Sequence, residues 1–171
     1  MIYTIGHSTH SAEAFLAILE THSIHQLADV RSLPRSRRHP HFTREALDEF
    51  LTAHEIAYRH FPALGGMRTP RPDSTNTALQ HAGFRGYADY MQLEAFDDGL
   101  DDLLTFAQQR RTTVMCAEAL WWECHRGLLS DALIVRGVPV RHIVSIAEAK
   151  PHELSGLARV RSRKVIYPGL L

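Results

Sequence analysis

Short apolar segments alternate with amphipathic segments along most of this chain, and that alternation limits the folds it can adopt. The apolar segments read as buried strands, and the segments between them carry apolar residues three or four apart, as on one face of a helix. Strands that alternate with helices form a mainly parallel sheet covered on both faces. We therefore predict a three-layer α/β fold with helices on both faces of a five-stranded sheet, its strands at residues 2–5, 26–30, 56–61, 112–116 and 138–144.

Two parts of the chain lack this regular pattern. Residues 62–86 contain several glycines and prolines and are predicted to be a long loop, ending at a short helix over residues 87–91. Loops of that length in compact domains are usually functional or disordered. Gly137 is expected to end the helix over residues 125–136. The tail from Ser145 onward is weakly patterned, and the segment Ser162–Lys164 within it is expected to be solvated.

The composition fits one soluble domain spanning residues 1–171. Lys and Arg together number 19, as do Asp and Glu, so the formal net charge is zero and any polyanion site must be local. The N-terminus lacks the features of a signal peptide, and no segment approaches the ~20 apolar residues that span a bilayer. We expect a cytoplasmic protein without a membrane partner, in which Cys116 and Cys124 are thiols. No sequence feature identifies a cofactor or an oligomeric state.

In open α/β sheets the functional site lies beyond the carboxyl ends of the strands. This rule places four segments at one edge of the predicted sheet: His7, Asp29–Arg31, His60 and Cys116–Glu118. They are scattered along the sequence, so their proximity is an expectation that depends on the fold class.

The segment from Cys116 to Arg126 carries the residues best suited to chemistry. Cys124 and His125 stand where a helix begins, and a helix N-terminus favours both a bound anion and a thiolate. Cys124 is therefore a better candidate nucleophile than Cys116, which is equally well explained as core filler at the end of an apolar strand. Glu118 or His125 is predicted to move a proton, and Arg126 to bind two oxygens of an anion.

A metal site is not predicted from these residues. The spacing from Cys116 to Cys124 is not a known zinc pattern, because zinc ligands usually occur as close pairs. A site made with His125 and His7 is geometrically conceivable but is the weaker hypothesis.

A basic loop follows the second predicted strand, with four arginines and two histidines within residues 31–41. In a neutral protein this is a strong local patch, and it favours phosphate binding by Arg31, Arg35 and Arg38. The alternative is a solvated loop with an ion pair to Asp29.

Glycines and aromatic residues form a third group of candidates. Gly65 and Gly66 are predicted to shape a loop over the site, through positive φ or a close backbone approach, with Arg68 and Arg85 nearby. Tyr87 either stacks on a nucleobase or packs its helix onto the core.

In combination, these segments resemble the DUF488 family. The similarity covers residues 4 to about 143 and implies a bacterial or archaeal cytoplasmic protein, but it implies no activity. It rests on Thr4–Ser8, Asp29–Ser32, Pro34–Ser36, Leu64–Gly66, Phe84–Met91, Met115–Glu118 and Cys124–Arg126. The strand-end cysteine and helix-opening arginine are also weakly similar to rhodanese-like and cysteine-phosphatase domains, where the two residues lie four or five apart rather than ten.

Three functions remain open from the sequence. The leading hypothesis is an enzyme, a cysteine-dependent transferase or hydrolase, that acts on a phosphate-bearing or nucleotide-like small molecule. The alternative is a non-catalytic nucleic-acid-binding protein, in DNA repair or stress response, that grips phosphates with the basic loop. In that alternative the two cysteines are structural. A third reading is metal sensing or storage, which elemental analysis would test.

Overall fold

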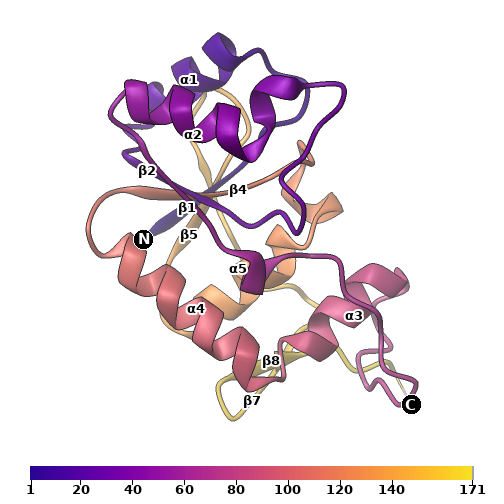
Figure 1. The fold of residues 1–171 in the computed structure, drawn as a ribbon. Helices are drawn as coiled ribbons and strands as arrows, with labels where there is room; N and C mark the ends of the chain where they lie inside the picture. Colours follow the sequence, from indigo (N-terminus) through magenta and orange to yellow (C-terminus); the bar gives the residue numbers. More distant parts are fainter. Residues whose placement is uncertain (171) are drawn as a thin grey trace.

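The computed structural model describes residues 1–170, which form three layers around a central sheet (Figure 1). The sheet has the strand order β3-β2-β4-β1-β5-β6, and its first five strands are parallel. These strands are β1 (Ile2–Gly6), β2 (Gln26–Asp29), β3 (Ala57–His60), β4 (Thr112–Cys116) and β5 (Val140–Ile143). The predicted α/β class with a mainly parallel sheet is therefore confirmed.

Each face of the sheet carries its own hydrophobic core. On one face α1 (Ala12–Thr21) and α2 (Arg44–Ala53) bury Phe15 and Leu47 against Ile5 and Met115. On the opposite face, as Figure 1 shows, lie α3 (Ala82–Tyr90), α4 (Glu94–Ala107) and α5 (Arg126–Val135). Gly137 ends α5 with a φ of +78°, the left-handed conformation that a helix-terminating glycine adopts.

The tail is more ordered than its weak pattern indicated. A sixth strand, β6 (Lys150–Pro151), pairs antiparallel with β5, and β7 (Arg159–Arg161) forms a hairpin with β8 (Lys164–Ile166). Ser162 and Arg163, which join the hairpin, have φ values of 47° and 64°. Both residues of this type of turn need a positive φ, which Asn-Gly usually supplies, so the sequence carried no recognisable hairpin signal.

One carboxylate on α3 orders the predicted long loop. Asp89 is buried and accepts hydrogen bonds from the Arg71 amide (2.8 Å), the Ser74 hydroxyl (2.6 Å) and the Asn76 side-chain amide (2.8 Å). The helix itself starts at Ala82, well before the predicted residue 87. The sequence did not predict this first part of the helix, because two glycines interrupt its helical pattern.

A buried hydrogen-bonded chain ties the tail to the sheet. Thr4 Oγ1 donates to His142 Nδ1 (2.7 Å), and His142 Nε2 donates to His152 Nδ1 (2.8 Å). His152 Nε2 donates to Asp131 Oδ1 (2.7 Å), whose second oxygen accepts from the Tyr167 hydroxyl (2.7 Å). The acceptor-only carboxylate fixes the direction of every bond in the chain.

His142 makes the stability of the fold sensitive to acid. Burial, together with the electrostatic effects of His152 and Arg126, lowers the pKa of His142 to about 3. An unfolded histidine has a pKa of about 6.5, so below that pH the unfolded state takes up a proton that the folded state does not. From pH 7.5 to pH 5 the free energy of unfolding should fall by about 2 kcal/mol through this residue.

Urea denaturation at the two pH values measures this loss. His142→Asn should remove about that much of the pH dependence, whereas His54→Asn, at an exposed position, should leave it unchanged. An undiminished pH dependence in His142→Asn would contradict the assignment.

Candidate functional site

A cavity of about 440 Å³ opens beyond the carboxyl ends of β1, β2 and β4. The register aligns these ends, because Gly6 pairs with Cys116 and Asp29 pairs with Met115. Of the residues predicted from sequence, the cavity brings together His7, Arg31, Arg35, Gly66, Cys116, Glu118, Cys124 and His125. The predicted strand-end location of the site therefore coincides with a cavity.

Two cysteines and one histidine form a compact cluster within this cavity. Cys116 is the last residue of β4, Cys124 follows a short turn, and His125 caps the N-terminus of α5. His125 Nδ1 lies 3.5 Å from Cys124 Sγ and 3.8 Å from Cys116 Sγ. The Arg126 amide, in the first turn of α5, donates to Cys124 Sγ over 3.5 Å. The cluster is buried, and a helix N-terminus points at one of its sulfurs.

The imidazole ring of His125 is held from three sides. Its Nε2 donates to the Val30 carbonyl (3.1 Å), which can only accept, so Nδ1 is the nitrogen that faces the two sulfurs. Tyr87 packs against the ring at a centroid distance of 5.0 Å. On the remaining side Gly66 lies so close that an added Cβ would be 2.4 Å from Nδ1.

The two thiols differ in acidity. The neighbouring Cys116 thiol lowers the pKa of Cys124, and the positive charge of Arg126 acts in the same direction, against desolvation by burial. Cys124 in turn raises the pKa of Cys116, as does burial. Of the two thiols, Cys124 therefore has the lower pKa, and Cys116 keeps its proton to higher pH.

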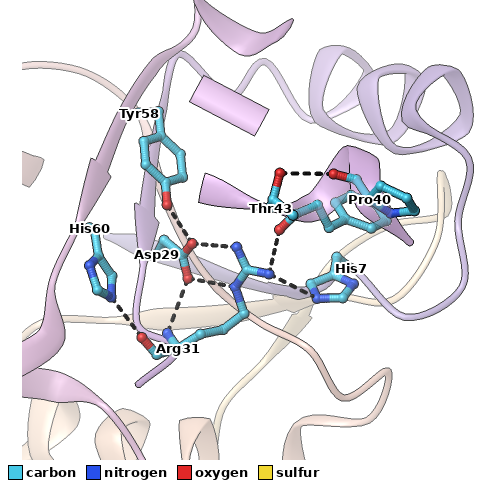
Figure 2. A network of polar contacts seen from close by, with 8 residues as sticks. His7, Asp29, Arg31, Pro40, Thr43, Tyr58 and His60 are labelled. Carbon is cyan, nitrogen blue, oxygen red and sulfur yellow. Dashed lines mark hydrogen bonds and ion pairs between the residues drawn. The ribbon is translucent and has the colours of Figure 1, made fainter. Parts of the chain in front are cut away.

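Arg31 is committed to an internal network, which Figure 2 shows. Its Nε and Nη2 donate to the two oxygens of Asp29 (2.9 and 2.6 Å), and its Nη1 donates to the Phe42 carbonyl (2.7 Å). Tyr58 donates to the same carboxylate (2.6 Å). Burial lowers the pKa of the neighbouring His7 to about 4. The alternative reading of Arg31, an ion pair with Asp29, is thus observed, and that ion pair holds the loop after β2 in place.

Arg126 lies behind the cysteines rather than in the cavity. Its side chain is 1% exposed, and its Nη2 donates to the carbonyls of Glu118 and Ala119. The guanidinium therefore joins the loop after β4 to the start of α5, which holds Cys116 and Cys124 side by side.

Five further predicted residues also lie outside the cavity lining: Arg38, Gly65, Arg68, Arg85 and Tyr87. Arg68 stacks on Tyr90 at 3.5 Å and donates to the Gly65 carbonyl (3.1 Å). Tyr87 donates to the Leu64 carbonyl (3.0 Å), so it packs against the core and His125.

The positive φ predicted for Gly65 was wrong. Its φ is −66°, so it needs no left-handed conformation. It is instead a point of close approach, since an added Cβ would lie 2.5 Å from Ser32 Oγ.

Sequence reasoning did not single out several polar residues that line the cavity: Ser32, Ser36, His81 and Glu123. Glu123 directly precedes Cys124, and that adjacency was an available signal. His81 reaches the cavity from the end of the long loop, and no local pattern marks it.

Comparison with known proteins identifies one relationship. The family model described as "Domain of unknown function DUF488" matches residues 11–133, which is more than half of the chain. No curated protein and no solved structure matches this chain. No helix within residues 1–170 is long and apolar enough to cross a membrane.

The difference between the two thiols predicts selective alkylation. In reduced, chelator-treated protein at pH 7, iodoacetamide should modify Cys124 at least about tenfold faster than Cys116, because the thiolate is the reactive form. Mass spectrometry of quenched samples reads each cysteine separately. Equal rates, or faster labelling of Cys116, would contradict the proposed order of acidity.

Gly66→Ala should slow that labelling of Cys124 several-fold. The new methyl group must displace the buried His125 ring, and we expect the overpacking to cost about 1–3 kcal/mol of stability. Gly156→Ala is the matched control, because a Cβ there would meet no atom within 4 Å. Parental labelling rates in Gly66→Ala would show that the ring position does not matter.

Proposed function

Because the chain belongs to the DUF488 family, whose description names no activity, we propose a function from the site itself. The protein is a cysteine-dependent transferase or hydrolase that acts on a phosphate-bearing, nucleotide-like small molecule. The observation that carries this proposal is the Cys116–Cys124–His125 cluster inside a 440 Å³ cavity.

Cys124 is the nucleophile in this proposal. Its sulfur forms a bond to phosphorus while the bond from phosphorus to the leaving oxygen breaks, and that oxygen takes a proton from Glu118 at the exposed edge of the cavity. An acceptor hydroxyl, water in a hydrolase, then breaks the sulfur–phosphorus bond and returns its proton to Glu118. The Arg126 amide stabilises the departing thiolate by donating a hydrogen bond to it.

The rim of the cavity supports an anionic substrate. Arg35 is exposed there and forms no ion pair with a carboxylate among residues 1–170. Ser32 Oγ accepts from the Met67 amide and Ser36 Oγ accepts from the His39 amide, both over 2.9 Å. Each serine hydroxyl therefore keeps its own hydrogen free to donate to a phosphate oxygen.

A panel of phosphate monoesters and nucleotides tests the proposal. With the best substrate, Cys124→Ser should lose more than about 100-fold in kcat, since its hydroxyl is a far weaker nucleophile. Cys116→Ser, whose hydroxyl would still lie beside the Cys124 sulfur, should lose much less activity than Cys124→Ser. Turnover that survives in Cys124→Ser would overturn the assignment of the nucleophile.

Arg35→Ala tests the anion contact separately. It should weaken protection of Cys124 from iodoacetamide by inorganic pyrophosphate about tenfold, because one charge-assisted hydrogen bond is lost. Arg161→Ala, on the exposed hairpin of β7 and β8, should leave protection unchanged. Equal protection in the Arg35 and Arg161 variants would remove Arg35 from the site.

A second candidate function, nucleic-acid binding, is favoured by three exposed arginines beside the cavity. Arg35, Arg37 and Arg38 lack carboxylate partners within the described residues 1–170. Binding of this kind would fall steeply with salt, would weaken when the three arginines are replaced by alanine, and would survive loss of both cysteines.

A further inference from the structure

We propose that Cys116, Cys124 and His125 form a three-ligand site for one zinc ion or a similar thiolate-binding divalent cation. The ligand atoms are the two Sγ atoms and His125 Nδ1, and all three lie within 4.8 Å of one another. The site goes beyond the proposed function and does not rest on it. The spacing of the two cysteines did not predict it, because a strand end and a helix start bring them together across an irregular loop.

The two sulfur–nitrogen distances already match those of a tetrahedral site. With Zn–S bonds of about 2.3 Å and a Zn–N bond of about 2.05 Å, the sulfur and nitrogen ligands of tetrahedral zinc lie about 3.6 Å apart. The corresponding distances here are 3.5 Å to Cys124 and 3.8 Å to Cys116. The two sulfurs, which lie within 4.8 Å of one another, need only close to the ~3.8 Å of a tetrahedral pair for both to coordinate one ion.

The surroundings of the cluster also suit a metal ligand. Histidines that bind metals almost always donate their second ring nitrogen to a carbonyl or carboxylate, which fixes the ring and its tautomer. His125 Nε2 does so to the Val30 carbonyl (3.1 Å). The Arg126 amide donates to Cys124 Sγ, as an outer partner of a thiolate ligand does.

Two thiolates and a neutral imidazole determine which cation the site selects. The thiolates offset the charge of a divalent ion, and soft sulfur ligands favour zinc over magnesium or calcium. On binding, Cys116 loses its proton to solvent. Three protein ligands leave a fourth position, and the cavity that both cysteines line gives water or a ligand access to it.

Coordination of zinc would weaken Cys124 as a nucleophile, because the bond to the metal withdraws electron density from the same sulfur. Zinc would therefore inhibit the proposed reaction reversibly. The two proposals fail independently: an enzyme that does not bind zinc keeps its nucleophile, and a zinc-binding protein without turnover keeps its metal site.

Titration of the reduced, chelator-treated protein with Zn²⁺ and Co²⁺ tests the site. We expect one equivalent of each metal to bind, and Co²⁺ to give a thiolate-to-cobalt charge-transfer band with the intense visible bands of four-coordinate cobalt. Cys116→Ser and Cys124→Ser should each weaken zinc binding more than about 100-fold, since even an outer-shell partner is worth 10–100-fold. His81→Asn, which removes another cavity histidine, should bind normally.

A measurement on the unaltered protein guards against variants that fail to fold. Equimolar Zn²⁺ should protect both cysteines from iodoacetamide, Mg²⁺ should protect neither, and a chelator should restore labelling. The proposal is overturned if no stoichiometric binding is found, if the cobalt spectrum lacks the thiolate band, or if both cysteines label at the full rate while zinc is bound.

Discussion

The hydrogen bond from His125 Nε2 to the Val30 carbonyl is the constraint on which the site depends. It joins the N-terminus of α5 to the residue that follows β2, two segments that are far apart in sequence. Because the carbonyl can only accept, the bond leaves Nδ1 facing Cys116 and Cys124. Without this bond the ring could rotate, and Nδ1 would no longer be held facing the two sulfurs.

Several segments that carry the family resemblance act on this one ring or on the loops beside it. Gly66 lies against the ring because it has no Cβ, and Tyr87 packs on another side. Gly6 allows the loop after β4 to pack closely against β1, since an added Cβ would lie 1.7 Å from the Glu118 carbonyl oxygen. Arg126 holds that same loop from behind. These residues therefore hold the reacting groups in place rather than react themselves.

The fold was predictable because strand and helix periods alternate clearly, and the strand-end rule then located the cavity. What the sequence could not reveal depends on tertiary partners. Arg31 and Arg126 look like anion ligands until Asp29 and the Glu118 carbonyl are found to engage them. The strands of the tail were not predicted, because the turn at Ser162 reaches a positive φ without a glycine to signal it in the sequence. In each case the decisive neighbour is distant in sequence.

Nitrogen NMR of His125 tests the central claim most directly. The ring-nitrogen chemical shifts, recorded in chelator-treated protein across a range of pH, report which nitrogen carries a proton. The account predicts that Nε2 remains protonated throughout, held by the Val30 carbonyl, and that only Nδ1 changes its state or responds to added zinc. A bare Nε2 with the proton on Nδ1 would contradict it, because the lone pair would then face away from both cysteines.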